Sequence, residues 1–247
     1  MKLFSWEAKI SSVLILSSAI LYGMHYLFFR DLNHIFLWGF TNIAFVPINV
    51  FLVTVIINRL LIRREKKLRM EKLNMVIGAF FSEVGTDLLA KLSNWDPDLE
   101  KIKERLVVSG EWTLEEFERI SVWLRKYKYN IDITKADLND LRSFLSEHRD
   151  FLLRLLENPN LLEHESFTDL LRAVFHLTDE LSQRKRLKSL IDADLNHLQG
   201  DIKRVYVKII VGWLDYMEYL KDNYPFMLSL AMRTNPFDDD ATPEVKG

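Results

Sequence analysis

Two long stretches without a formal charge constrain this sequence more than any other feature. The first runs from Ile10 to Phe29 and the second from Ile35 to Asn58, so they are 20 and 24 residues long. A helix rises about 1.5 Å per residue, so each stretch is long enough to cross a hydrocarbon layer about 30 Å thick. The sequence therefore predicts two membrane-spanning helices, at about 10–29 and 35–58, within an N-terminal region of residues 1–62.

The connector between these spans is the short segment RDLNH, Arg30 to His34. Because so short a connector forces the spans to run antiparallel, we expect residues 1–62 to form a transmembrane helical hairpin. The start MKLFSWEAK, followed by an apolar run, is also typical of a secretory signal. However, the run is longer than a signal needs and no A-x-A-like cleavage site follows it. We therefore expect the first span to be retained.

Positive charge collects directly after the second span. Residues 1–69 carry nine Lys and Arg against three acids, although the whole chain has a net charge of -2. Six of these cations form a basic cluster: Arg59, Arg63, Arg64, Lys66, Lys67 and Arg69. Cations beside a span mark its cytosolic end and attract anionic lipid head groups. We expect both termini in the cytosol, a place in the inner (cytoplasmic) membrane, and no nucleic-acid partner because the remaining chain is acidic.

Polar side chains recur every seven residues within the spans. They are Ser11, Ser18 and His25 in the first span and Asn42 and Asn49 in the second. Seven residues are close to two helical turns, so each set lies on one face of its helix. These faces either form hydrogen bonds within the hairpin or between the protomers of a homo-oligomer, or line a polar path enclosed by several hairpins. Pro47 is predicted to kink the second span.

An amphipathic pattern follows the basic cluster. Its apolar positions are spaced by three and four residues: Leu73, Ile77, Phe80, Val84, Leu88 and Leu92. This spacing predicts a juxtamembrane helix over residues 63–95. Because no proline occurs between Asn58 and Trp95, we expect the second span to continue directly into this helix.

Residues 96–232 contain further signals for the starts of helices. They are Asp96 with Pro97, a capping box of Thr113 and Glu116, and starts near Thr134, Ser166 and Asp192. No alternation typical of strands accompanies them. The predicted fold is therefore all-α, with the hairpin followed by a cytosolic bundle of five or six helices. Residues 233–247 are predicted to be a flexible acidic tail.

The sequence contains few signals for a catalytic, nucleotide-binding or metal-binding site. The chain has no cysteine, and it lacks a glycine-rich phosphate loop, a G-x-S-x-G elbow and an H-E-x-x-H motif. The candidate metal ligands are His176, Asp179 and Glu180 in one segment and Asp194 and His197 in the next. They fall short of the Glu-x-x-His pairs of a metal site in a helical bundle. We therefore expect no enzyme activity, no cofactor and no metal site.

Two segments carry a resemblance to known proteins. They are MVIGAFFSEVG, Met75 to Gly85, and DYMEYLKDNYPFMLSLAMRTNPFD, Asp215 to Asp238. In these segments the chain resembles an uncharacterised group of prokaryotic membrane proteins with two spans and a helical cytosolic region. The resemblance extends over nearly the whole chain and implies a prokaryotic inner membrane. It implies no activity and assigns no functional residue.

Together these features predict a membrane-anchored cytosolic helical module. It binds an unknown cytosolic protein or relays a signal, and it forms a homo-oligomer. The alternative is a small oligomeric two-span channel or tension-responsive pore. The intramembrane polar faces distinguish the two: hydrogen-bonded inside a closed hairpin they favour the anchor, and lining a central axis they favour the pore.

Overall fold

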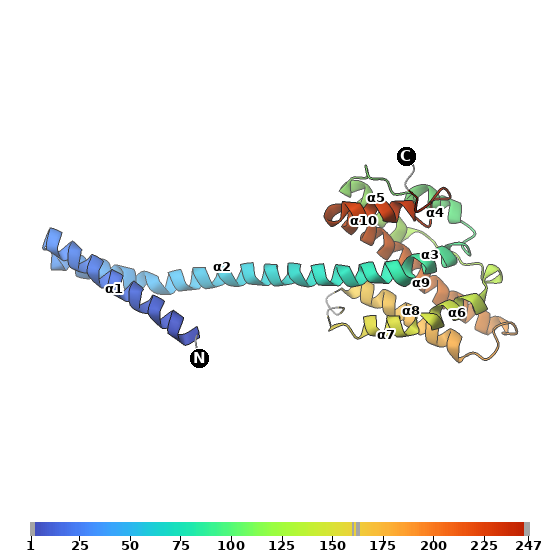
Figure 1. Ribbon diagram of the computed structural model, residues 1–247, viewed down its shortest axis with the longest axis horizontal. Coiled ribbons are helices and arrows are strands. Elements are labelled where there is room, and N and C mark those ends of the chain that lie inside the picture. Colours follow the sequence, from blue (N-terminus) through green and yellow to red (C-terminus); the bar gives the residue numbers. More distant parts are fainter. Residues whose placement is uncertain (1–2, 160, 162–163, 245–247) are drawn as a thin grey trace. The chain divides into compact units, whose positions relative to one another are not determined.

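The computed structural model describes residues 3–159, 161 and 164–244, except for the side chains of residues 3–8, Lys67 and Arg69. All regular elements in these ranges are helices, and none is a strand. The chain divides into two units, Met1–Glu65 and Lys66–Gly247, called here the hairpin unit and the helical domain. The predicted all-α class is confirmed (Figure 1).

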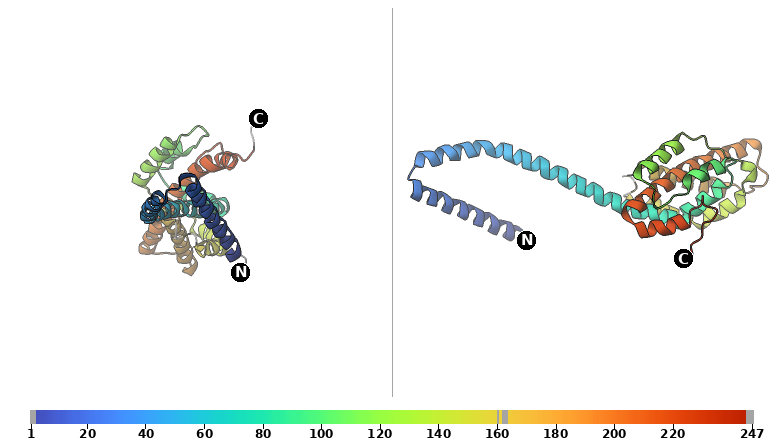
Figure 2. Two further views of the ribbon diagram at one scale, coloured as in Figure 1. Left: turned by 90° about the vertical axis from the view of Figure 1, so that its left-hand side faces the viewer. Right: turned by 90° about the horizontal axis from the view of Figure 1, so that it is seen from above.

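The hairpin unit contains α1 (Leu3–Phe29) and the first part of α2 (Leu32–Phe80). The chain reverses between them, as Figure 2 shows. Arg30 adopts a left-handed φ of 48°, and the Asp31 carboxylate accepts a hydrogen bond of 3.0 Å from the N–H of His34. This bond starts α2 at Leu32, so the turn is shorter than the expected connector of Arg30 to His34.

Helix α2 is a single helix of 49 residues that includes Pro47 and the whole basic cluster. The prediction that the second span continues as a helix beyond the cluster is therefore confirmed as far as Phe80. A π-helical turn, η1 (Phe81–Gly85), and α3 (Thr86–Ser93) follow it. The helix predicted over residues 63–95 thus consists of three successive segments. In the π turn, both the N–H and the hydroxyl of Thr86 donate to the carbonyl of Phe81.

Seven further α-helices lie in the described part of the helical domain. They are α4 (Leu99–Leu106), α5 (Leu114–Lys126), α6 (Leu138–Glu147), α7 (Arg149–Leu156), α8 (Glu165–Gln183), α9 (Asp192–Asn223) and α10 (Pro225–Arg233). A short 3-10 helix, η2 (Ile133–Lys135), precedes α6. The sequence predicted five or six helices here. The structure has more because the helix expected from Thr134 is divided at His148 and because Pro225 starts an additional helix.

Helix α9 is the centre of the domain. It packs against α3, α5, α8 and α10, and it buries Ile202, Ile209 and Trp213, among others. The apolar stripe of this helix is therefore part of the core. The buried apolar core of the domain begins at Leu73, near the end of α2.

The predicted helix starts are confirmed at some positions and wrong at others. The capping box at the start of α5 is present: the Thr113 hydroxyl accepts from the N–H of Glu116, and the Glu116 carboxylate accepts from the N–H of Thr113. Asp96 does not cap α4. It is buried and accepts from the N–H of Asp98, so α4 begins only at Leu99.

The tail predicted to be flexible from residue 233 is anchored to the domain through residue 239. Phe237 is 1% exposed, with its ring 5.3 Å from that of Trp213 in an edge-on arrangement. The side-chain amide of Asn235 donates to the carbonyl of Leu106 at 2.8 Å, and Lys103 pairs with Asp239. One apolar ring and one buried amide therefore fix a segment that is otherwise acidic. Residues 245–247 lie outside the described residues.

Candidate functional site

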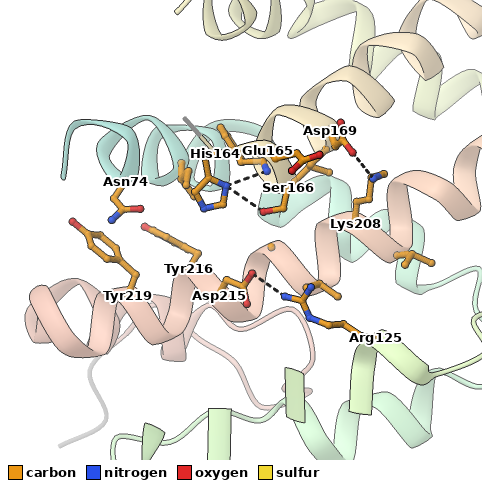
Figure 3. A pocket seen from close by; sticks show the side chains of 16 residues that line it. Asn74, Arg125, His164, Glu165, Ser166, Asp169, Lys208, Asp215, Tyr216 and Tyr219 are labelled. Carbon is orange, nitrogen blue, oxygen red and sulfur yellow. Dashed lines mark hydrogen bonds and ion pairs between the residues drawn. The ribbon is translucent and has the colours of Figure 1, made fainter. Parts of the chain in front are cut away.

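The helical domain contains a pocket of about 430 Å³ between α8 and α9 (Figure 3). Residues of α2 and Arg125 of α5 complete its wall. Its apolar lining includes Ile77, Leu170, Val207 and Val211, and polar side chains surround this lining. This size and composition are typical of a ligand site, in which a few polar groups orient an apolar ligand.

Local packing explains why the pocket remains open. Phe81 of the π turn stacks on Tyr216 of α9, with ring centroids 5.2 Å apart and planes at 12°. Tyr216 is part of the wall, so the π turn positions one side of the pocket. Gly212 lies beside it, where an added Cβ would be 3.4 Å from Leu170 and 3.6 Å from Phe81. The glycine therefore leaves space that a larger side chain would fill.

The start of α8 supplies the next group of polar atoms. His164 is the N-cap residue, and its Nδ1 accepts the N–H of Phe167 at 3.2 Å. The hydroxyl of Ser166 lies 3.2 Å from the same Nδ1. A serine beside a histidine is typical of nucleophilic catalysis. Here the Nδ1 lone pair already accepts a backbone N–H, so it is not free to take a proton from Ser166.

Each of the two cations of the pocket pairs with an acid. Arg125 and Asp215 approach to 3.8 Å, and Lys208 and Asp169 to 3.4 Å. Burial raises the pKa of Asp215, while the charge of Arg125 opposes this rise. Burial also raises the pKa of Tyr219 to about 12. Because each cation faces an acid, the pocket has no surplus of positive charge for a free anion.

The residues of this pocket have no common signal in the sequence. Arg125, His164, Lys208 and Asp215 come from three helices and lie far apart along the chain. In the sequence, each of them alone indicates only an ordinary surface charge or a helix cap. The only local signal was the predicted start of a helix near Ser166, and α8 begins one residue earlier, at Glu165.

The predicted polar faces of the hairpin unit are mainly exposed. Ser11, Ser18, Asn42 and Asn49 are exposed, and none of them forms a side-chain hydrogen bond with another described residue. His25 is partly covered and stacks on His34, with ring centroids 5.9 Å apart. The two predicted faces are therefore not joined by hydrogen bonds within one chain.

The basic cluster lies on α2. Arg59, Arg63, Arg64 and Lys66 are exposed, and the side chains of Lys67 and Arg69 are outside the described residues.

The structure brings some of the candidate metal ligands together and separates others. His176 and Glu180 of α8 lie against His197 of α9, together with Asp201, which the sequence analysis missed. Asp179 instead faces Arg149, and Asp194 binds Arg184. Asp201 follows His197 by four residues, and this spacing on one helical face was the available signal.

Comparisons with known proteins place this fold in a family. The family model described as "Uncharacterized protein MJ1433, C-terminal helical domain" matches residues 69–233, and "MJ1433, N-terminal helical domain" matches residues 2–61. The uncharacterised protein MJ1433 of Methanocaldococcus jannaschii is 48% identical over 230 residues, which are 93% of this chain and 92% of that protein. No solved structure matches the chain.

Proposed function

The chain belongs to the family of the uncharacterised protein MJ1433, and we propose that it is a two-pass membrane protein whose cytosolic helical domain binds another protein. The supporting observation is a contrast between the two units. The helical domain buries most of its large apolar side chains, whereas the hairpin unit exposes most of its own.

The exposed side chains are large and numerous. The most apolar 18-residue stretches of α1 and α2 contain no buried residue. Phe40 is 78% exposed, whereas Phe80 and Phe117 in the domain are fully buried. Each large apolar side chain left in water forgoes roughly 1.5–3 kcal/mol of burial free energy. A hydrocarbon layer would remove this cost, and helices satisfy their own backbone groups there.

The basic cluster supports the orientation. Arg59, Arg63 and Arg64 are exposed on α2 next to its apolar part. Cations in this position stay on the cytosolic side during insertion. The helical domain follows them in the chain, so the proposal puts the domain and its pocket in the cytosol, with the cluster at the lipid head groups.

The pocket is the proposed binding surface of the module. An apolar side chain of a partner would fill the space beside Val207, Val211 and Gly212. The surrounding pairs of Arg125 with Asp215 and Lys208 with Asp169 offer charges of both signs. We therefore propose as ligand an amphipathic protein segment that carries an apolar anchor flanked by both acidic and basic residues.

A second candidate function is an oligomeric two-span pore. It is favoured by Asn42 and Asn49, whose side-chain amides are exposed on α2 without a hydrogen bond to any described residue. An unpaired amide in lipid is costly, so a membrane location requires these amides to face another protomer or water. Both candidate functions are compatible with an oligomer. A measurement of ion conductance distinguishes the pore from the anchored module.

The test of the module is photo-crosslinking in membranes. A photoreactive amino acid replaces Val207 in the pocket, and the matched control replaces Lys203, which is exposed on the same helix. The membranes are illuminated first and are then extracted at alkaline pH, which removes proteins that are neither crosslinked nor embedded in the membrane. The proposal predicts that the chain stays in the pellet and forms a discrete protein adduct from position 207 only. Loss of the chain from the pellet, or equal adducts from both positions, would contradict it.

A further inference from the structure

A second cluster of side chains lies between α8 and α9, away from the pocket residues. Each helix contributes a histidine and an acid four positions later: His176 with Glu180, and His197 with Asp201. Residues four apart lie on the same helical face. Because α8 and α9 pack together, their two pairs meet and four ligand-type side chains converge.

Asp201 is the unusual member of this cluster. It is 3% exposed, and its Oδ1 accepts a bond of 2.5 Å from Arg204. Its Oδ2 is buried and has no hydrogen-bond partner in the described part of the structure. A buried carboxylate oxygen without a hydrogen bond destabilises the folded state unless another partner is present. This oxygen points toward the Nε2 atoms of His176 and His197, at 3.5 and 3.3 Å.

These separations fit atoms that share one ion. Two ligands at about 2.1 Å from a tetrahedral Zn²⁺ lie roughly 3.4 Å from each other. Besides the two distances at Asp201, the Nε2 of His197 is 3.5 Å from the Oε2 of Glu180. The ligand atoms of Glu180, His197 and Asp201 all lie within 4.8 Å of one another. The Nε2 of His176 is 3.9 Å from the other oxygen of Glu180, which lies one turn later on the same helix, α8.

We propose that Glu180, His197 and Asp201, completed by His176, bind a divalent transition-metal ion of the Zn²⁺ class. Two imidazoles favour this class over Mg²⁺ and Ca²⁺, which prefer oxygen ligands. Such an ion gives the buried Oδ2 of Asp201 its missing partner and links α8 to α9. This site lies beyond the proposed binding function and needs no membrane or partner.

Neighbouring side chains orient the carboxylates as outer ligands do in metal sites. Arg204 holds one oxygen of Asp201 and leaves the other directed at the histidines. Arg184 donates to the Oε2 of Glu180 at 2.5 Å and to the Oδ1 of Asp194 at 2.6 Å. These contacts fix the Glu180 side chain, and they direct Asp194 toward Arg184 rather than toward the proposed ion.

The test is metal binding by the untagged full-length chain in detergent, because a histidine tag would bind the same ions. Bound metal is removed with a chelator, and calorimetry follows titration with Zn²⁺. Titration with Co²⁺ is followed by its visible absorption, which is strong in tetrahedral coordination. The native chain should bind one ion per chain. His197→Ala and Asp201→Asn should each weaken binding about 100-fold or more, since even outer-shell changes cost 10–100-fold.

The matched control is Asp179→Asn, which removes an acid of α8 that faces Arg149. It should bind the ion as the native chain does. Because Asp201 is buried, its variant can misfold, so His197→Ala at a half-exposed position gives the decisive comparison. Absence of Zn²⁺ binding by the native chain would overturn the proposal. Binding that survives His197→Ala unchanged, or is lost equally in Asp179→Asn, would also overturn it.

Discussion

Phe237 packs edge-on against Trp213, with ring centroids 5.3 Å apart, and so fixes the C-terminal segment to the central helix α9. Phe237→Ala should lower the free energy of unfolding of the helical domain by about 3 kcal/mol, because it leaves a cavity beside the indole. Thermal unfolding followed by circular dichroism measures the effect. The control is Phe226→Ala, at a position 75% exposed, which should change stability by less than about 0.5 kcal/mol. Equal effects of the two changes would mean that the segment is not anchored.

Gly85 ends the π turn in crowded surroundings. A Cβ added there would lie 2.7 Å from ring atoms of both Phe80 and Phe81. Gly85→Ala should therefore destabilise the domain by about 1–3 kcal/mol, as overpacked core positions do. Gly200→Ala is the matched control, because an added Cβ would meet no atom within 4 Å beyond the neighbouring backbone of its own helix, and it should stabilise α9 by about 0.5–1 kcal/mol. Opposite signs in urea unfolding are expected, and the same sign for both would contradict the described packing.

Asp96 gives stability a pH dependence of defined sign. Burial raises the pKa of its carboxyl above the ordinary value of 3.8. As the pH rises above 3.8, the Asp96 carboxyl ionises in the unfolded chain at a lower pH than in the folded chain. Ionisation therefore lowers the stability of the folded state as the pH rises. Asp96→Asn should therefore be more stable than the native chain at pH 7, and the difference should shrink toward pH 3. Melting temperatures across this range measure it.

Asp132 provides the opposite control for this pH series. The hydroxyl and N–H of Thr134 donate to its carboxylate and lower its pKa. Its ionised form is stabilised in the folded state, so Asp132→Asn should cost stability at pH 7 and progressively less as the pH falls below 3.8. A common sign for the Asp96 and Asp132 variants would contradict the assigned environments.

The sequence predicted the fold class because the two apolar stretches and the three- and four-residue spacing are local properties. It correctly predicted a helix continuing past the basic cluster, and the capping box at Thr113. It misplaced the cap at Asp96, because burial of that carboxylate is decided by tertiary packing. The anchored tail was missed for the same reason: a single Phe237 in an acidic segment carries no periodic signal.

The sites were harder to predict than the helices. Asp201 follows His197 at a helical spacing, but only the packing of α8 against α9 brings this pair to His176 and Glu180. The pocket likewise combines Arg125 of α5 with Lys208 of α9. Convergence of separate helices has no signature in a single sequence.

The exposed amides of Asn42 and Asn49 predict association between hairpin units. Replacing both by Leu should shift the detergent-solubilised chain from oligomer to monomer, since each such bond in a membrane contributes about 0.6–2 kcal/mol. Light scattering coupled to size-exclusion chromatography measures the mass. Thr41→Val is the control, because the Thr41 hydroxyl already donates to the carbonyl of Leu37. An unchanged mass in the double variant would contradict the prediction. Conductance in liposomes that is lost with the two amides would favour the pore.

The most direct test of the anchored cytosolic domain is single-cysteine labelling, which the absence of native cysteine makes clean. Asn33→Cys lies in the first turn of α2, next to the turn that joins α1 to α2, and Ser146→Cys is exposed on α6. A membrane-impermeant maleimide is added to intact cells and again after lysis. The proposed topology predicts labelling at position 33 in intact cells and at position 146 only after lysis. Labelling at position 146 in intact cells, or protection of both positions until lysis, would contradict it.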